Sequence, residues 1–265
     1  MKHLQILDKL AAKHLVQSID EDLARLTFYA MCYEKNDIDK QLSYILPKLL
    51  NRWNCILNAN HNISEIYKQK AVLALNILLH KYGFTDKKIA DKALKSIDAL
   101  NENVALSDDF FSKSEQIKQY IIAAPTPLKR KPSVPESITF YREKDVISIQ
   151  LREHFYGAYI HEIRGLNEAP VLEFYNGVFN KKPTLKELEN LPAKGQLYDD
   201  KTEHISLFSI AGIKFLPDPA NQIQLISACV ENKPKNNHLT ESVGLYQMSD
   251  IFKIQDTIET FFSSK

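Results

Sequence analysis

The chain changes its hydrophobic period at one proline-rich stretch, and this change constrains the fold more than any other feature. Residues 123–135 read AAPTPLKRKPSVP and contain four prolines. Before this stretch apolar residues recur at helical spacing, and after it they tend to alternate with polar residues, as in β-strands. We therefore expect an α+β protein with an all-helical domain over residues 1–124, a proline-rich basic linker over 125–136 and a β-rich domain over 137–265.

The N-terminal part predicts about six helices, arranged as a bundle or a short solenoid. Its first apolar stripe comprises Leu4, Leu7, Leu10, Ala11 and Leu15. Short connections between successive helices favour antiparallel neighbours, and no sequence period marks a true repeat array.

Capping residues and breakers set the expected bounds of these helices. Ser18 followed by Glu21 predicts the start of a second helix, and Pro47 predicts a kink or a restart within the third. Gly83 suits a left-handed C-terminal cap. The remaining expected N-terminal caps are Asn62, Thr85 and Ser107.

The C-terminal part predicts an antiparallel sheet or open barrel that carries two helices. One helix is expected to open at Pro183-Thr184, and the last is expected to be capped by Ser249 or Asp250. The segment from Gln222 to Val230 has apolar residues on both faces, which favours a central strand. The expected strands are 138–141, 146–151, 156–163, 171–179, 205–210, 213–216, 222–230 and 243–248.

Composition excludes several classes of protein. A formal net charge of +1 on 265 residues implies neither nucleic-acid binding nor attraction to an acidic membrane. The N-terminus is amphipathic rather than typical of a secretory signal, and no apolar run is long enough to span a bilayer. Three cysteines, Cys32, Cys55 and Cys229, lie far apart in apolar runs and are expected to be buried, reduced thiols. We therefore expect a cytoplasmic protein.

No motif for catalysis, a cofactor or a metal ion occurs in the sequence. Seven glycines are spread through the chain without a phosphate-binding pattern, and no CxxC or HExxH spacing is present. His154, His161 and His204 all lie in the β-rich part, where a general base or a metal site would need them to meet. Isolated histidines are the favoured interpretation, so no catalytic residue, metal or cofactor is predicted.

Aromatic residues are concentrated in two of the expected strands. Tyr156 and Tyr159 lie on opposite faces of their strand, as do Phe174 and Tyr175. Packing within the sheet is one interpretation of this concentration. The other is that one aromatic residue of each pair is exposed and binds a partner protein, together with Glu162, Arg164 and Glu173.

The β-rich part is slightly acidic. Residues 137–265 contain 14 Lys and Arg residues against 17 Asp and Glu residues. Asp199, Asp200 and Glu203 form the densest acidic cluster, in a segment expected to be an irregular loop. These three carboxylates complete the set of candidate partner-binding residues.

One segment resembles a known group of proteins. Asp145–Leu151, Tyr156–Ile160, Leu172–Tyr175 and Lys182–Leu188 are similar to a pattern in immunity-protein families of bacterial polymorphic toxin systems. In that pattern a Gly-Asp strand precedes a Gly-Tyr strand, an aromatic-ended strand and a short Pro-Thr-Leu helix. Lys144, Gln150 and Ala158 depart from it.

The resemblance implies a protein that binds a cognate toxin and blocks it, without chemistry of its own. If the toxin is a nuclease with a basic cleft, the acidic cluster would attract it. Two alternatives remain open from the residues. One is a nucleic-acid-associated protein that uses Lys129, Arg130 and Lys131, which is disfavoured because no aromatic residues interleave with them. The other is an enzyme with a histidine-containing site at the domain junction.

Overall fold

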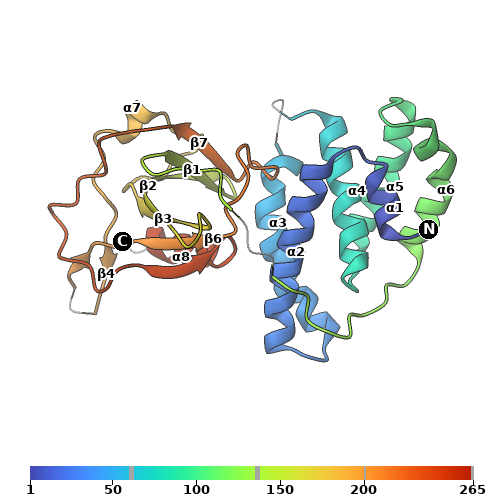
Figure 1. Ribbon diagram of the computed structural model, residues 1–265, viewed down its shortest axis with the longest axis horizontal. Coiled ribbons are helices and arrows are strands. Elements are labelled where there is room, and N and C mark those ends of the chain that lie inside the picture. Colours follow the sequence, from blue (N-terminus) through green and yellow to red (C-terminus); the bar gives the residue numbers. More distant parts are fainter. Residues whose placement is uncertain (60–62, 135–137, 200, 264–265) are drawn as a thin grey trace. The chain divides into compact units, whose positions relative to one another are not determined.

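The computed structural model describes residues 1–59, 63–134, 138–199 and 201–263 (Figure 1). The chain forms two compact units, Met1–Pro135 and Glu136–Lys265. The first is helical, and the second contains a six-stranded mixed sheet with two helices. The expected α+β class is therefore confirmed, and the sheet does not close into a barrel over the described residues.

Six helices form the first unit, as expected. Two sequence-based assignments of their ends are also correct: Gly83 has a φ of 86° just after the fourth helix, and Ser107 caps the sixth. The side chain of Asp37 caps the third helix. The bounds are α1 His3–Asp8, α2 Lys13–Tyr33, α3 Ile38–Leu57, α4 Glu65–Lys81, α5 Lys87–Glu102 and α6 Asp108–Ile122.

Two other expected caps are displaced. The side chain of Asp86, rather than that of Thr85, accepts a hydrogen bond from the backbone N–H of Ile89 at the start of α5. Ser64 caps α4 through the N–H of Tyr67. Asn62, the cap expected from the sequence, lies outside the described residues.

The boundary between the first two helices lies earlier in the chain than expected. The chain turns at Ala11, where φ is 48°, and α2 begins at Lys13. Ser18 is buried inside α2 instead of capping it. The apolar stripe from Leu15 to Leu26 runs past Ser18 without interruption, so burial of that stripe outweighs the local capping signal.

α3 continues through Pro47, so of the two outcomes expected there, a kink or a restart, the restart does not occur. Ile45 and Leu49 are buried on either side of it, and the same face continues through Trp53 and Ile56. Because the buried face keeps its register across Pro47, packing along the whole helix holds it together. Pro47 itself is exposed.

A buried polar contact joins α2 to α3. Asp22 Oδ2 accepts hydrogen bonds from Arg52 Nε at 2.8 Å and from Trp53 Nε1 at 2.9 Å. All three side chains are buried. A charge removed from water in this way needs its partners, so the contact fixes how the two helices face each other.

The proline-rich stretch lies against the helical unit. His80 Nε2 is 2.9 Å from the carbonyl oxygen of Ala123, and a Cβ atom on Gly83 would lie 2.8 Å from Cα of Pro127. Lys131 Nζ lies 5.5 Å from the centroid of the Phe28 ring. Lys131 of the expected linker is therefore exposed and also contacts side chains of α2.

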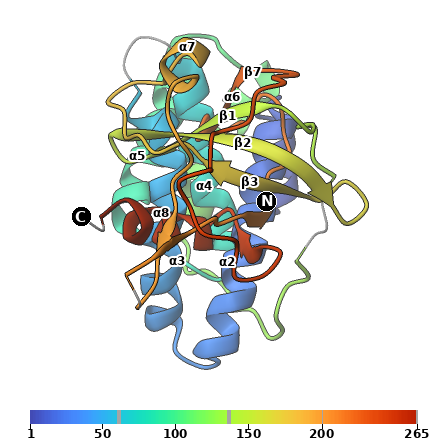
Figure 2. The same ribbon diagram turned by 90° about the vertical axis from the view of Figure 1, so that its left-hand side faces the viewer.

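The second unit is built on a sheet with the order β7-β1-β2-β3-β6-β8. Figure 2 shows its three longest strands, β1, β2 and β3, side by side. A separate pair, β4 and β5, forms a small hairpin. The bounds are β1 Val146–Leu151, β2 His154–Arg164, β3 Ala169–Phe174, α7 Leu185–Leu188, β4 Gln196–Leu197, β5 Glu203–His204, β6 Phe208–Ala211, β7 Ile223–Ser227, β8 Gln247–Asp250 and α8 Lys253–Ser263.

Several strand predictions are wrong. β6 and β8 pair in parallel, so the sheet is mixed rather than antiparallel. The expected central strand, Gln222–Val230, supplies β7 at one edge of the sheet. Its apolar residues on both faces are only partly buried apart from Ile223. Residues 138–141 and 213–216 are not strands.

The two helices of this unit are capped much as the sequence predicts. Thr184 and Glu187 form a capping box at the start of α7. Asp250 Oδ1 accepts hydrogen bonds from the N–H groups of Phe252 and Lys253, where the chain enters α8.

Candidate functional site

The aromatic residues expected to bind a partner are buried on both faces of the sheet. Tyr156, Tyr159, Phe174 and Tyr175 are each at most 7% exposed. The expectation that one member of each pair is exposed is therefore wrong. Alternation does place the members on opposite faces, but each face has its own cover.

α8 covers the face that carries Tyr156 and Phe174. The ring of Phe262 lies 4.7 Å from that of Tyr156 and 5.8 Å from that of Phe174, measured between centroids. Phe261 and Phe208 extend this aromatic cluster across β6. Burial raises the pKa of the Tyr156 hydroxyl, and the nearby Glu259 carboxylate raises it further.

α7 and the following loops cover the opposite face. Leu188 of α7 packs with Val146, Tyr159 and Tyr175 in one buried cluster. The Tyr159 hydroxyl donates to the carbonyl oxygen of Val230 at 3.1 Å. Burial also raises the pKa of Tyr175. Aromatic side chains in this half of the sheet therefore serve packing.

Glu173 occupies an unusual position on the same face. Its side chain is 1% exposed, and its Oε2 lies 2.7 Å from Nε2 of His161. Its Oε1 accepts a hydrogen bond of 3.2 Å from Asn236 Nδ2. A bulge in β2 between Ile160 and Glu162 allows His161 to reach Glu173. Glu173 thus joins two strands to the long loop that contains Asn236, and it is not available to a partner.

Glu162 and Arg164 are the members of the set that remain partly exposed on β2. They form an ion pair of 2.7 Å, and each side chain is about two-fifths exposed. The Arg164 guanidinium also lies 5.0 Å from the centroid of the Tyr246 ring. These contacts connect the end of β2 to the segment that precedes β8.

Two of the three predicted acidic residues are on the β4–β5 hairpin. Asp199 and Glu203 are exposed, and Asp200 lies outside the described residues. Lys194 Nζ is 3.8 Å from Glu203 Oε1. The expected irregular loop is therefore a short hairpin that presents the acidic side chains at the surface.

This hairpin is attached to the residues that lead into β8. The N–H of Thr240 donates to the carbonyl oxygen of Glu203 at 2.9 Å, and the N–H of Ile205 donates to that of Thr240 at 3.0 Å. His204 Nδ1 lies 2.7 Å from the carbonyl oxygen of Glu241. Residues 203–205 are therefore joined directly to Thr240 and Glu241, which precede β8 in the chain.

Exposed apolar side chains lie on these same two segments. Leu197 is 51% exposed, Val243 64%, Leu245 76% and Met248 77%. Large apolar side chains that gather on a surface rimmed by polar groups mark binding sites for other proteins. We call this set the acidic–apolar surface; it comprises Leu197, Val243, Leu245 and Met248 with Asp199, Glu203 and Glu241.

Sequence reasoning found the acidic half of this surface and missed the apolar half. Val243, Leu245 and Met248 lie in a segment that reads as an ordinary strand with alternating apolar residues. The strand begins only at Gln247, so Val243 and Leu245 lie in the bend before it and Met248 lies in the last strand of the sheet. The scarcity of apolar residues in the preceding stretch, residues 231–242, was the one available signal that little core lies there.

The three histidines singled out in the sequence, among the four of the β-rich part, have different surroundings. His161 pairs with Glu173, and His204 lies between Thr202 and Glu241. His154 lines a cleft of about 300 Å³ beside Tyr156 and α8. Over the described residues, no three His, Cys, Asp or Glu side chains lie close enough together to hold a metal ion.

The cysteine prediction is correct for Cys55, which is buried, and wrong for Cys32 and Cys229, which are exposed. Cys229 has a φ of 54° in the bend after β7. Its apolar neighbours in the sequence do not enclose it, because the strand ends at Ser227. None of these three cysteines forms a disulfide bond in the described residues.

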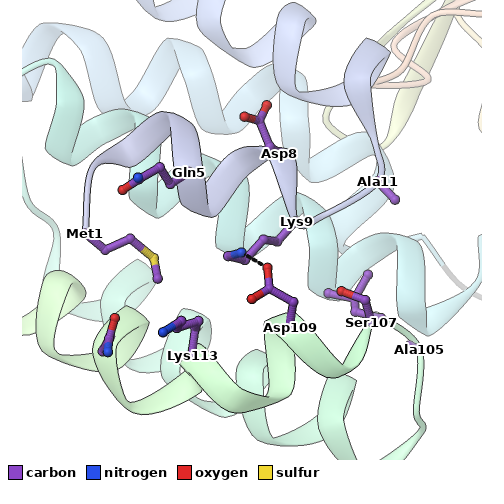
Figure 3. Close-up of a pocket in the computed structure, with 11 residues that line it drawn as sticks. Met1, Gln5, Asp8, Lys9, Ala11, Ala105, Ser107, Asp109 and Lys113 are labelled. Atoms are coloured by element: carbon purple, nitrogen blue, oxygen red, sulfur yellow. Dashed lines mark hydrogen bonds and ion pairs between the residues drawn. The ribbon is translucent and has the colours of Figure 1, made fainter.

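A cavity of about 860 Å³ lies between α1 and α6 in the helical unit (Figure 3). Lys9 and Asp109 form an ion pair across it, and Lys113, Gln5 and Ser107 add further polar groups. Asp8 also lines the cavity, so its wall presents charges of both signs.

Among the helices that the structure describes, none has both the length and the apolar character needed to cross a bilayer. Comparison with family models, curated proteins and solved structures returned no significant match to the chain.

Proposed function

We propose that this protein binds another protein through the acidic–apolar surface, and that it acts as an immunity protein that blocks a bacterial toxin in the cytoplasm. The observation that carries the binding role is the exposure of four apolar side chains beside three carboxylates on one pair of joined segments. The resemblance in residues 145–188 supplies the class of partner.

The composition of the surface suits a partner with a basic cleft. Exposed carboxylates at a rim accelerate diffusional encounter with a positively charged protein, and apolar side chains between them hold the complex by removing surface from water. In this mechanism the protein inhibits by occupying the cleft and needs no reaction of its own.

The sheet supplies the rigidity that such an inhibitor needs. The buried Glu173–His161–Asn236 contact ties the long loop before β8 to the centre of the sheet. The hairpin is likewise bonded to residues 240 and 241. A surface that is already ordered loses less conformational entropy on binding, which increases affinity.

Protection from a toxin tests the proposal directly. Each toxin domain encoded beside the gene for this chain is produced in bacterial cells with and without the chain, and surviving colonies are counted. We expect survival only when the chain is present. Equal killing in its presence, or the lack of any such toxin gene, would refute the proposal.

A charge reversal then tests the surface. Changing Asp199, Asp200 and Glu203 to lysine should slow association with the neutralised toxin and weaken its dependence on salt concentration. The matched control reverses three exposed carboxylates elsewhere, Asp91, Glu102 and Glu143. An association rate that changes equally in both variants would show that net charge alone is responsible.

A further inference from the structure

β8 lies at one end of the sheet, and β6 is its one neighbouring strand among the described residues. The N–H of Gln247 donates to the carbonyl oxygen of Leu207 at 2.8 Å, and the N–H of Ile251 donates to that of Ala211 at 3.0 Å. Backbone groups of successive residues in a strand point to opposite sides. The N–H and C=O of Met248, one residue after Gln247, therefore point away from β6.

The opposite edge of the sheet is blocked by a lysine side chain and a bulge, whereas β8 is limited only by its length of four residues. At β7 the ammonium of Lys182 donates to the outward carbonyl oxygen of Leu225 at 2.7 Å, and the register with β1 shifts between Val146 and Ile147. Lysines, prolines and bulges are the usual means by which edge strands avoid pairing with other chains. The segment Leu245–Asp250 contains no lysine and no proline, and its register with β6 is regular.

The side chains around this edge define what could pair with it. Met248 and Leu245 are about three-quarters exposed. Glu241 is exposed in the segment that leads into β8, and the exposed Glu203 is bonded through the backbone to Thr240, the neighbour of Glu241. A strand added here would place alternate side chains against apolar atoms and others beside carboxylates. Asp250 is committed to the start of α8, so the available stretch lies on the N-terminal side of that residue.

We propose that β8 accepts an extended, basic segment of the partner protein as an additional strand of the sheet. Backbone hydrogen bonds to Met248 would fix the register, while Leu245 and the carboxylates would select apolar and basic side chains. The proposal that a strand pairs with β8 is based on the strand geometry. The identification of that strand as part of a toxin rests on the proposed function.

Replacing Met248 with proline isolates the backbone contribution. Proline removes the outward N–H but no hydrogen bond to β6, and proline is tolerated at edge positions of this kind. The control, Met248→Ala, shortens the side chain and keeps the N–H. We expect Met248→Pro to bind the toxin domain about tenfold more weakly than Met248→Ala, which corresponds to the loss of roughly one backbone hydrogen bond.

Hydrogen exchange provides a second measurement in the full chain. The amide of Met248 should exchange rapidly in the free protein and slowly in the complex, while the melting temperature of each variant confirms that it is folded. Equal affinities of the two variants, or an unprotected Met248 amide in the complex, would overturn strand addition. If the toxin is neutralised equally by both variants, the proposed function stands and this inference fails.

A displayed library of short random peptides tests the edge independently of any toxin. Selection on the wild-type chain, with removal of binders to Met248→Pro, should enrich peptides with alternating basic and apolar residues. Failure to enrich any would overturn the inference. Sedimentation of the chain alone tests whether a second copy of the chain binds this edge instead. A dimer that Met248→Pro abolishes would assign the edge to a second copy and exclude the partner segment.

Discussion

The buried contact of Glu173 with His161 allows a quantitative test of how the second unit is held together. His161→Phe removes the donor to Oε2 of Glu173, and that carboxylate remains in a site where its side chain is 1% exposed. Leaving a buried polar group without its hydrogen-bond partner costs about 1–3 kcal/mol, and more when the group is charged. His161 is 21% exposed, so water replaces part of the contact, and we expect a loss of about 2–3 kcal/mol.

Glu173→Gln should cost less, about 1 kcal/mol, because it removes the charge and keeps groups that hydrogen-bond to Asn236 and His161. In the double variant, His161→Phe with Glu173→Gln, no carboxylate is left buried without its donor. The losses of unfolding free energy in the two single variants should therefore add up to about 1–2 kcal/mol more than the loss in the double variant. Glu162→Gln is the matched control on the exposed side of β2, and it should cost about 0.5 kcal/mol or less.

The measurement needs a signal from the second unit alone. Urea titration of the full chain, followed by hydrogen exchange of peptides that span β2 and β3, gives its free energy of unfolding. Trp53 is the only tryptophan and lies in the helical unit, so its fluorescence should be unchanged. Additive losses within about 0.5 kcal/mol, or a Glu162→Gln variant as unstable as His161→Phe, would refute the reasoning.

Two further predictions concern other contacts. Asp22→Leu leaves the buried Arg52 guanidinium without this carboxylate and should lower the free energy of unfolding of the helical unit by about 3–5 kcal/mol. Asp22→Asn keeps a hydrogen-bonding oxygen and should lower it by about 1 kcal/mol. Urea titrations followed by Trp53 fluorescence measure both losses, and equal losses would contradict this. The backbone N–H and hydroxyl of Thr184 hold the pKa of Glu187 below its ordinary value of 4.5, so the capping box contributes fully above that pH and is lost as pH falls through the lower, folded-state pKa. Titration followed by NMR should show a higher Glu187 pKa in Thr184→Ala, still below the ordinary value because the backbone N–H remains; an unchanged pKa would argue against the hydroxyl's contribution.

The sequence was informative about helix ends where a single residue type is required. Gly83 and Ser107 meet requirements that few other residues meet, a positive φ and a side-chain acceptor. It misled at Ser18, and α3 does not restart at Pro47, because at both residues the same kind of local signal competes with a buried stripe many residues long. Burial of a whole helix face contributes more free energy than one cap or one missing donor.

The sheet shows a different limit. Alternation of residue types predicted β1 and most of β2, because successive side chains of a strand point to opposite faces of the sheet. The same reasoning made Gln222–Val230 central and Ile213–Leu216 a strand, since period alone does not say what lies beside a segment. The parallel pairing of β6 with β8 also depends on a long connection that has no signature of its own.

The position of the candidate site follows from how completely the sheet is covered. α8 covers one face, and α7 with its loops covers the other, so the aromatic residues of β2 and β3 are used in packing and cannot meet a partner. β7 is closed by Lys182, which leaves β8 as the edge without such protection. Exposed apolar side chains would be a liability for solubility on any edge strand, unless something binds there. Their presence on β8 and on the adjoining hairpin, beside carboxylates, is therefore the strongest physical reason to place partner binding at this end of the sheet.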